Sequence, residues 1–365
     1  MTGPRVAIDV GSLHGPQTGV GQFVARLLEG LADLEAPPAM QPYVVSFRAQ
    51  LRPGVVRLRY PAALALRAWG RGDRPRADRA LRGAAVVHGP NYVVPPTRLP
   101  TVVSVHDCWF LRQPTDGAVR WFGAILRRAV QRGATVHVPS QHTAGQAREL
   151  LGAERIAVVP LGAPSVLPSG APVHLAGLDG RPYVLALGAK EPRKNLPRLI
   201  DAFGLLHDEL PDLALVLLGP DGPDQPAIDE AIARQPRPAS ERILLVDYVS
   251  DDERNAIVHG ASALAYPSLD EGFGFPALEA MAAGVPVVAA DAGSLPEVCG
   301  DAAALVDPLD ANAIAGALSR VITDESARRQ LVRLGHERTE RFSIARCAAG
   351  MDALYRALAE GGGRP

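Results

Sequence analysis

The segment Pro267-Ser-Leu-Asp-Glu-Gly-Phe-Gly-Phe-Pro-Ala-Leu-Glu-Ala-Met-Ala-Ala-Gly-Val-Pro-Val-Val288 decides how this chain is interpreted. It places two carboxylates, Glu271 and Glu279, eight residues apart, with the turn Gly272-Phe273-Gly274 between them. A proline in the first turn and a glycine just past the end are typical of a helix, here from about Pro276 to Ala283. We therefore expect Glu279 on a helix and Glu271 in the loop before it.

This arrangement suits a phosphorylated ligand that carries several hydroxyl groups. The N–H groups of a helix start attract phosphate, and glycine lets the backbone approach a ligand closely. Carboxylates accept hydrogen bonds from vicinal hydroxyls, such as those of a ribose or a hexose. The alternative is that Glu271 and Glu279 are solvated acids that stabilise the helix dipole. That role does not require the apolar rings and bare backbone that Gly-Phe-Gly-Phe-Pro is expected to expose, so the segment predicts a sugar-nucleotide site.

The same segment resembles the Glu-x7-Glu signature of the retaining glycosyltransferases of sequence family 4, which have the GT-B fold. Four further segments match the family pattern in the same order: Gly19-Val20-Gly21, Val105-His106-Asp107, Glu191-Pro-Arg-Lys-Asn195 and Ser294-Leu-Pro-Glu-Val298. The resemblance extends from about Val6 to Tyr355 and is strongest to a mannosyltransferase-like subgroup. It implies two facing Rossmann-like domains, a cleft between them, and a last helix that returns to the N-terminal domain.

Length and composition agree with a globular enzyme of two domains. The chain has 365 residues, of which 47% are hydrophobic, and exceeds the usual size of a single core. A net charge of −1 gives no general attraction to nucleic acid. Three widely spaced cysteines, Cys108, Cys299 and Cys347, fit a reducing cytosol. A strand-like segment directly after Met1-Thr-Gly-Pro-Arg5 predicts that there is no signal peptide. The Ala-, Arg- and Gly-rich composition suggests a bacterial source.

Strands and helices alternate along the chain, which predicts an α/β fold of two doubly wound parallel sheets. We expect an N-terminal, acceptor-binding domain over 1–165, a linker over 166–181, a nucleotide-sugar-binding domain over 182–342 and a returning helix over 343–360. The predicted strands are Arg5–Val10, Tyr43–Phe47, Ala85–His88, Thr101–Val105, Thr135–Pro139, Tyr183–Leu187, Ala214–Leu218, Ile243–Val246, Ala263–Tyr266 and Val285–Ala289. The main predicted helices are Gly21–Leu31, Gly117–Arg132, Leu196–Leu210, Gln225–Ala233, Asp251–Gly260, Ala311–Thr323, Glu325–Phe342 and Ile344–Leu358. The last residues, 361–365, are expected to be disordered.

Two adjacent cations, Arg193 and Lys194, follow the predicted strand Tyr183–Leu187. Fixed positive charge of this kind can neutralise a diphosphate and stabilise it as it departs. The resemblance assigns both residues to the donor diphosphate; a solvated basic loop is the alternative. Many relatives have Gly-Arg where this chain has Gly188-Ala189, so the division of work between the two cations stays open.

Glu279 is expected, from the resemblance, to bind the donor ribose. Glu271, with the amides of Phe273 and Gly274, is expected to hold the hydroxyls of the transferred sugar, and Gly272 and Phe275 complete this donor-binding turn. Tyr248 and Val249, after another predicted strand, resemble the family segment beside the nucleobase. Ser294 to Glu297 is expected to shape the same pocket, although Glu297 alone could be a surface acid at a helix start. Gly219-Pro-Asp-Gly222 also ends a predicted strand.

His106 ends a predicted strand of the first domain, where ligands of doubly wound sheets bind. The resemblance places this histidine against the donor sugar and the β-phosphate, with Asp107 orienting it or touching the acceptor. Gly19 and Gly21 precede the first helix and are expected near the diphosphate, with the acceptor contacts Gln17, Thr18 and Gln22. His88-Gly89-Pro90-Asn91 is expected to face the cleft. Ser140 is expected to cap the helix that follows it.

The chain has no Asp-x-Asp motif, which would hold a divalent metal on the diphosphate, and Asp9, Asp247 and Asp291 are isolated from one another. We therefore expect chemistry without a metal or a bound cofactor.

Residues 48–82 hold ten arginines and only two acids, Asp73 and Asp78, together with Leu64, Leu66 and Trp69. A basic and partly apolar surface can dock on anionic lipid. We expect a cytoplasmic protein. Because many family members use lipid-linked acceptors, peripheral contact of this segment with the inner face of the membrane is one option. A solvated arginine-rich face is the other.

The resemblance implies a retaining hexosyltransferase of polysaccharide biosynthesis, which uses a nucleoside-diphosphate sugar and a saccharide, lipid-linked or small-molecule acceptor. GDP-mannose is the first donor expected, and UDP and dTDP sugars stay open. A sugar-nucleotide epimerase or hydrolase on the same scaffold, and a non-catalytic sugar-nucleotide-binding subunit, are the alternatives. A phosphorylase would need a pyridoxal phosphate lysine, yet Lys190 and Lys194, which are the two lysines of the chain, both fall in the predicted diphosphate loop. The broken glycine pattern after Gly21 disfavours a nicotinamide dehydrogenase.

Overall fold

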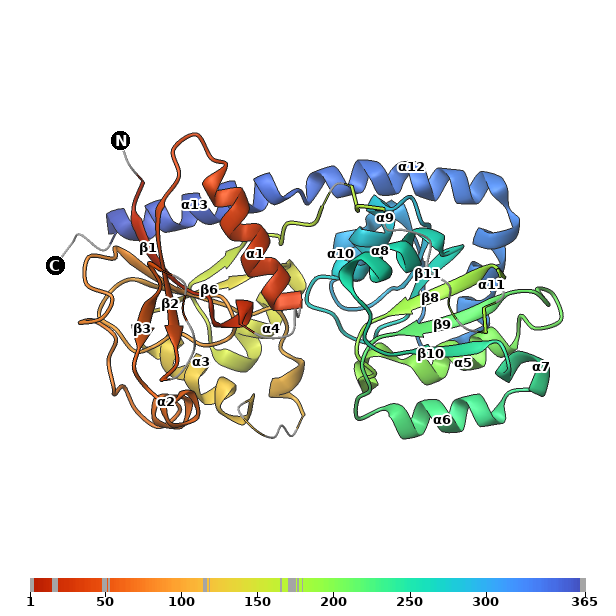
Figure 1. Ribbon diagram of the computed structural model, residues 1–365, viewed down its shortest axis with the longest axis horizontal. Coiled ribbons are helices and arrows are strands. Elements are labelled where there is room, and N and C mark those ends of the chain that lie inside the picture. Colours follow the sequence, from red (N-terminus) through yellow and green to blue (C-terminus); the bar gives the residue numbers. More distant parts are fainter. Residues whose placement is uncertain are drawn as a thin grey trace. The chain divides into compact units, whose positions relative to one another are not determined.

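The computed structural model describes residues 3–14, 19–47, 51, 53–113, 117, 119–164, 166–169, 175, 177–178 and 180–361. Two compact units make up the chain (Figure 1). The first unit consists of Met1–Gly162 and Ser343–Pro365, and the second of Ala163–Phe342. Gln17, Thr18, Arg48, Arg52 and the tail over 362–365, for which the sequence made predictions, lie outside the described residues.

In the described part of the first unit, seven parallel strands form one sheet in the order β3-β2-β1-β4-β5-β6-β7. Its strands are β1 (Arg5–Asp9), β2 (Ala39–Val45), β3 (Val56–Leu58), β4 (Val86–Gly89), β5 (Thr101–Ser104), β6 (Thr135–Val138) and β7 (Ile156–Val158). Its helices are α1 (Gly19–Ala32), α2 (Ala62–Trp69), α3 (Phe122–Gln131), α4 (Gln141–Leu151) and α13 (Ile344–Gly361). The central strands are buried on both faces, which is why they have continuous apolar sequences rather than alternating ones.

The last helix, α13, packs directly on α1 within the first unit. A Cβ atom at Gly30 of α1 would lie 2.8 Å from the Cγ2 atom of Ile344 and 3.0 Å from the Cβ atom of Ala348. Tyr355 of α13 is fully buried, and its hydroxyl lies 2.8 Å from Nδ1 of His88 in β4. The end of the chain is therefore part of the core of the first unit.

The second unit has, among its described residues, six parallel strands in the order β10-β9-β8-β11-β12-β13. They are β8 (Tyr183–Leu187), β9 (Ala214–Leu218), β10 (Ile243–Val246), β11 (Ala263–Tyr266), β12 (Val287–Ala290) and β13 (Ala303–Val306). The helices are α5 (Leu196–Gly204), α6 (Gln225–Arg234), α7 (Arg237–Ser240), α8 (Asp251–Gly260), α9 (Phe275–Ala282), α10 (Leu295–Cys299), α11 (Ala311–Thr323) and α12 (Glu325–Arg341). The doubly wound α/β class predicted from the sequence is confirmed.

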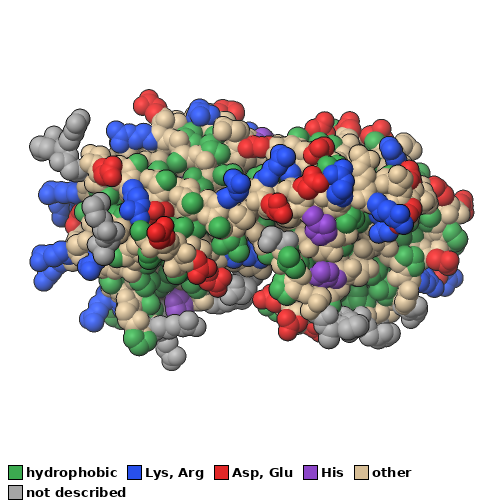
Figure 2. Space-filling model, turned by 90° about the horizontal axis from the view of Figure 1, so that it is seen from above, with side chains coloured by type: hydrophobic (Ala, Val, Ile, Leu, Met, Phe, Trp, Pro, Cys, Tyr) green, Lys and Arg blue, Asp and Glu red, His purple; other side chains and the backbone are tan. Residues whose placement is uncertain are grey.

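Helix α12 shows how the surface of the second unit is built. Its exposed face carries ion pairs three and four residues apart, between Glu325 and both Arg328 and Arg329, and between Arg333 and Glu337. Figure 2 shows acidic and basic side chains interspersed on this face. Pairs of this kind contribute little stability but keep the surface free of a single dominant charge.

The strand order of the second unit creates a switch point beside β8. From β8 the chain continues outward to β9 and β10, and then crosses back to β11 on the opposite side of β8. Ligands of open α/β sheets bind outside the carboxyl ends of the strands at such a point. The loops after β8 and β11, which contain Arg193, Lys194 and Glu271, both start there.

Some predicted boundaries were wrong, and some short elements were not predicted. The helix predicted over Gly117–Arg132 begins only at Phe122, after a 3-10 turn over Val119–Trp121. The helix predicted over Leu196–Leu210 ends at Gly204. Strands β3 and β7 have three residues each, and such short strands carry too little periodicity to be recognised. Helix α2 also escaped prediction, since it has eight residues in an arginine-rich stretch.

The close approach of two strand ends gives a test of this packing. Gly219, after β9, has φ of +148°, and a Cβ atom there would lie 2.2 Å from the carbonyl oxygen of Gly188 after β8. Gly219→Ala should therefore lower the free energy of unfolding by about 2 kcal/mol or more, measured by urea titration. Gly316→Ala is the control, because that helical position has open space and the change should raise stability by about 0.5–1 kcal/mol. Equal effects at the two positions would contradict the packing described here.

Candidate functional site

The carboxylate of Glu271 forms the centre of a buried ionic cluster at the switch point of the second unit. Lys194 donates a hydrogen bond from Nζ to Oε1 of Glu271 over 2.6 Å, and Nη1 of Arg193 lies 2.8 Å from the same oxygen. The side chain of Glu271 is only 9% exposed. The structure therefore brings together three residues that the sequence placed in two separate motifs.

The cations determine the charge state of Glu271. Burial alone would raise the pKa of this carboxyl, but attraction to Lys194 and Arg193 and hydrogen bonds from Lys194 and Tyr266 outweigh it and lower the pKa to about 2. Burial lowers the pKa of Lys194 from its usual value, and Glu271 opposes that shift. The ring of Tyr266 lies beneath the ammonium group, with its centroid 4.9 Å from Nζ. Glu271 is thus an ionised acceptor over the whole physiological pH range.

Local backbone geometry holds Lys194 and Arg193 at this position. Both lie in a 3-10 turn over Pro192–Lys194, which ends at Asn195 with φ of +55°. The side-chain amide of Asn195 donates hydrogen bonds from Nδ2 to the carbonyl oxygens of Pro267 and Pro308. The bond to Pro267 ties the turn to the loop after β11. Nε of Arg193 donates to Glu191 over 2.7 Å. The other lysine, Lys190, donates to Asp221 over 2.6 Å and is not part of the cluster on Glu271.

The turn between the two glutamates leads directly into α9. Gly274, the residue before the helix, has φ of +110°, a conformation that favours glycine. The hydroxyl of Ser294 donates to the carbonyl oxygen of Phe273 over 2.9 Å, and the amide of Ser294 donates to that of Glu271 over 3.1 Å. A Cβ atom at Gly293 would lie 2.7 Å from the amide nitrogen of Glu271. Gly293 and Ser294, directly before α10, therefore pack against the turn between Glu271 and α9 and stabilise it.

The ring of Phe273 is not exposed, contrary to the expectation from the sequence. It is 4% exposed and packs edge-on against Phe275 and Phe342, with centroids 5.5 Å apart in each case. The ring of Phe273 is buried because Phe342, at the end of the unit, provides an apolar surface on which it packs. Phe273 thus anchors the turn through its ring, and Gly272 is buried beside it.

Glu279 lies on α9 and is 1% exposed. Its Oε2 atom is paired with Arg254 of α8, a residue that the sequence analysis did not single out. No local spacing links the two residues, because they are 25 positions apart on different helices. Tyr248, expected beside the nucleobase, is 69% exposed just before α8, and Val249 follows it with partial exposure.

His106 follows β5 in the first unit. Its Nε2 atom donates to the carbonyl oxygen of Pro90 over 2.7 Å, so the neutral ring has Nδ1 as its acceptor. Burial lowers the pKa of His106 to about 4, and the bond to Pro90 only partly opposes this shift. The rings of Phe23 and Tyr92 pack against it at 5.2 and 5.5 Å. His106 is therefore neutral at pH 7 and can accept a hydrogen bond.

The structure of the first unit differs from the sequence prediction at Gly19, Gly21 and His88 and agrees with it at Ser140. Gly19 and Gly21 form the first turn of α1 rather than a loop before it. His88 does not face a cleft: it is fully buried and lies 2.8 Å from both Tyr355 and Ser104 through its two ring nitrogens. Ser140 caps α4 as predicted, accepting a hydrogen bond from the amide of Thr143.

Asp107 accepts hydrogen bonds from the backbone amide of Trp109 and from the hydroxyl of Tyr92, which holds these two neighbours in place.

Within the described residues no group of three or more His, Cys, Asp or Glu side chains is arranged to hold a metal ion. The same part of the chain contains no helix with the length and apolarity needed to span a bilayer.

Two family models match the two halves of the chain. Residues 18–165 match "Glycosyltransferase Family 4", and residues 176–338 match "Glycosyl transferases group 1". The O-antigen chain mannosyltransferase B of Escherichia coli is 30% identical over 285 residues, which is 75% of this chain and 74% of that protein. The serotype-specific mannosyltransferase WbdA of Escherichia coli is 32% identical over 167 residues, but they cover only 20% of that protein and 46% of this chain.

Solved structures share the fold over nearly the whole length. Sucrose-phosphate synthase from Thermosynechococcus elongatus has a TM-score of 0.74 at 21% identity, over 98% of this chain and 100% of that one. Anabaena HepE, solved in complex with UDP and glucose, has a TM-score of 0.72 at 18% identity, over 97% of this chain and 100% of that one. At these identities the likeness concerns the fold alone.

The charge of Glu271 should appear in the pH dependence of stability. Its folded pKa of about 2 lies below the ordinary 4.5, so its ion pairs stabilise the fold above pH 4.5 and lose that effect as the pH falls toward 2. Glu271→Gln should lower the free energy of unfolding by roughly 3 kcal/mol at pH 7. At pH 3.5 the loss should be smaller, by about 1 kcal/mol, than the loss at pH 7. Urea titration at both pH values measures this difference.

The control for that experiment is Glu230→Gln, which removes an exposed acid of the same unit whose partner is Arg234. Its effect should stay below about 0.5 kcal/mol at either pH. A loss in Glu271→Gln that does not change between pH 7 and pH 3.5 would contradict the ionic cluster.

Proposed function

This chain belongs to glycosyltransferase family 4 and is a hexosyltransferase, and we propose that it transfers mannose from GDP-mannose with retention of the anomeric configuration. The observation that carries the proposal is the cluster of Glu271 with Arg193 and Lys194 at the switch point of the second unit. The mannosyltransferases among its relatives favour mannose as the sugar. The acceptor is a hydroxyl of a saccharide, a lipid-linked saccharide or a small molecule.

The geometry supports a donor site with charge at one end and hydroxyl acceptors at the other. Arg193 and Lys194 would contact the diphosphate, since a guanidinium and an ammonium group form charge-assisted hydrogen bonds to phosphate oxygens. Ionised Glu271, with the amides of Phe273 and Gly274 and the glycine turn that continues through Gly272 to Phe275, would hold the sugar hydroxyls. Glu279 would accept from the ribose, and the segment of Tyr248 and Val249 would lie at the nucleobase.

The reaction proposed here needs no protein nucleophile. The acceptor oxygen attacks the anomeric carbon on the face from which the diphosphate departs, the bond from that carbon to the β-phosphate oxygen breaks, and the departing oxygen takes the proton of the acceptor hydroxyl. Charge develops on the diphosphate, so Arg193 and Lys194 stabilise it where it forms. Neutral His106 would accept a hydrogen bond from the sugar, and the first turn of α1, with Gly19 and Gly21, would lie near the phosphates. No metal ion or cofactor takes part in the proposed scheme.

A thermal-shift panel of GDP, UDP, dTDP and ADP with their sugar conjugates tests the donor. A ligand that binds the folded state raises the melting temperature by mass action. We expect GDP and GDP-mannose to give the largest rise. A larger rise in melting temperature with UDP or dTDP would show that the donor is a sugar conjugate of that nucleotide rather than GDP-mannose. No rise with any of these ligands would contradict the sugar-nucleotide site.

Removal of the Glu271 carboxylate tests its role in transfer. With GDP-[14C]mannose and a panel of simple glycosides, Glu271→Ala should lower transfer by roughly a hundredfold or more and change GDP affinity by no more than about threefold. Glu230→Ala is the control and should match the unmodified enzyme. Full transfer in Glu271→Ala would refute the role, and donor consumption that does not depend on acceptor would favour an epimerase or hydrolase.

We also propose that the first unit contacts anionic membrane lipid through its arginine-rich face. Arg67, Arg71 and Arg120 line a hollow of about 380 Å³ around Trp121. The guanidinium carbons of Arg71 and Arg120 lie 4.8 and 5.3 Å from the centre of the Trp121 ring.

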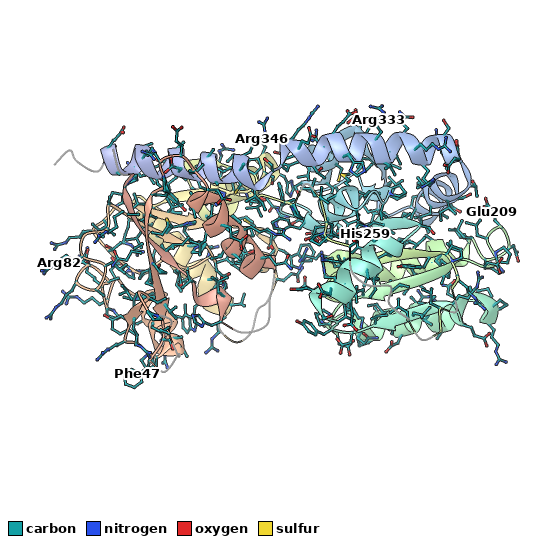
Figure 3. All side chains as sticks on the ribbon, turned by 45° about the horizontal axis from the view of Figure 1, so that its top comes forward. Phe47, Arg82, Glu209, His259, Arg333 and Arg346 are labelled. Atoms are coloured by element: carbon teal, nitrogen blue, oxygen red, sulfur yellow. The ribbon has the colours of Figure 1, made fainter. Side chains whose placement is uncertain are left out.

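Apolar side chains are also exposed on the first unit. Phe47 and Leu64 are 59% and 61% exposed. Figure 3 shows the side chains of Phe47 and Arg82 pointing away from the body of the unit. The two acids of the segment are already paired, Asp73 with Arg128 and Arg132 and Asp78 with Arg76.

Vesicle sedimentation at low salt tests this contact. Each cation near an anionic surface contributes about 1 kcal/mol, so the triple change Arg67→Gln, Arg71→Gln, Arg120→Gln should weaken binding to phosphatidylglycerol vesicles by roughly a hundredfold. The matched control is Arg328→Gln, Arg329→Gln, Arg333→Gln on α12, which removes the same charge from the second unit. Equally weak retention of the unmodified protein on neutral and anionic vesicles would rule the contact out.

A further inference from the structure

The ion pair between Arg254 and Glu279 joins two helices that have separate expected tasks. Glu279 lies on α9, whose start is the donor-binding turn, and Arg254 lies on α8, which begins just after Tyr248 and Val249. The side chains of Arg254 and Glu279 are 19% and 2% exposed. A carboxylate buried to this extent needs a counter-charge, and Arg254 supplies it.

The start of α8 is fixed by its own sequence, which fixes the position of Arg254. Ser250 and Glu253 form a capping box, in which the Ser250 hydroxyl accepts from the amide of Glu253 over 3.3 Å and the Ser250 amide donates to the Glu253 carboxylate over 2.9 Å. The amide of Arg254 then donates to the carbonyl oxygen of Ser250 over 2.8 Å. Arg254 therefore has a defined position relative to the Tyr248 segment that precedes the cap.

Arg254 bonds across the helix interface although acids are present in its own helix. Asp251, Asp252 and Glu253 directly precede it and are exposed, whereas its ion-pair partner Glu279 is buried on α9. The bond from Nη2 of Arg254 to Oε2 of Glu279 is charge-assisted and therefore fixes where that carboxylate oxygen lies. A carboxylate has about four acceptor positions, which allows it to accept from Arg254 and from ligand hydroxyls at the same time.

We propose that Arg254 is a positioning residue for the donor ribose: it holds the Glu279 carboxylate, across the interface of α8 and α9, in the orientation that accepts from the ribose hydroxyls. The inference rests on the proposed function of Glu279 and assigns a task to a residue outside the Glu-x7-Glu segment. It predicts that the preference for a ribonucleotide over its 2′-deoxy form depends on a residue that itself need not touch the nucleotide.

The experiment measures the affinities of GDP and 2′-deoxy-GDP by isothermal titration calorimetry, or of UDP and 2′-deoxy-UDP if the thermal-shift panel selects uridine. The unmodified protein should bind GDP about tenfold more tightly than 2′-deoxy-GDP, the value of one hydrogen bond to a charged acceptor. In Arg254→Met this preference should fall to about twofold or less, because GDP binding weakens while 2′-deoxy-GDP binding changes little. Arg237→Met, at an 89% exposed arginine of the same unit, should keep the full preference.

Three outcomes overturn the proposal. Full ribose preference in Arg254→Met means that Glu279 is oriented without Arg254. An equal loss for both nucleotides means that Arg254 acts on the fold rather than on the ribose. A preference that survives in Glu279→Leu, which removes both acceptor oxygens, shows that the assignment of Glu279 to the ribose is itself wrong, which separates failure of the proposed function from failure of this inference.

A folding control keeps the test decisive. Circular dichroism should show that Arg254→Met is folded; if it is not, Arg254→Lys keeps the charge but lacks the planar group. A ribose preference reduced at least threefold in Arg254→Lys would then support the proposal, and an unchanged preference would overturn it.

Discussion

The buried charge of Glu271 is the constraint around which the second unit is organised. A carboxylate with so little exposure is costly unless cations compensate it, and Lys194 and Arg193 do so at 2.6 and 2.8 Å. To reach it, both cations must sit in one turn after β8, and that turn must be tied to the loop after β11 through Asn195. The strand order, which places β8 next to β11, makes this meeting feasible.

The same constraint explains the chemistry that the site supports. Two cations that the turn over Pro192–Lys194 already holds in place can stabilise charge on a departing diphosphate without reorganising during the reaction. The carboxylate, kept ionised by those cations, is a strong acceptor for sugar hydroxyls. In the proposed function, one cluster would therefore contact the groups on both sides of the bond that is broken. The neutral state of His106 follows from burial in the same way, since burial disfavours its charged form.

Much of the architecture could be predicted from the sequence, because the strands are buried and continuous and the helices have clear starts. Strands β8, β9, β10 and β11 and helices α8 and α11 have the predicted bounds. The sequence also grouped Glu271, Arg193 and Lys194 in one site, by family resemblance and by the rule for strand ends. Their proposed roles toward donor and acceptor remain predictions.

Other features depend on contacts between distant segments and were therefore beyond reach. Arg254 and Glu279 pair across two different helices, and their separation in the sequence does not predict this contact. Phe273 is buried because Phe342, far along the chain, packs on it. His88 looked like a residue of the ligand-binding edge, yet Tyr355 of the last helix and Ser104 enclose it in the core.

The central claim is that the cluster on Glu271 receives the β-phosphate of a nucleoside diphosphate. Calorimetric affinities of GDP and GMP, for the unmodified protein and for Arg193→Met, test it most directly. We predict that the unmodified protein binds GDP at least about tenfold more tightly than GMP, because a hydrogen bond to a charged group is strong, and that Arg193→Met loses most of this difference. An unchanged ratio of the two affinities in Arg193→Met would contradict the account.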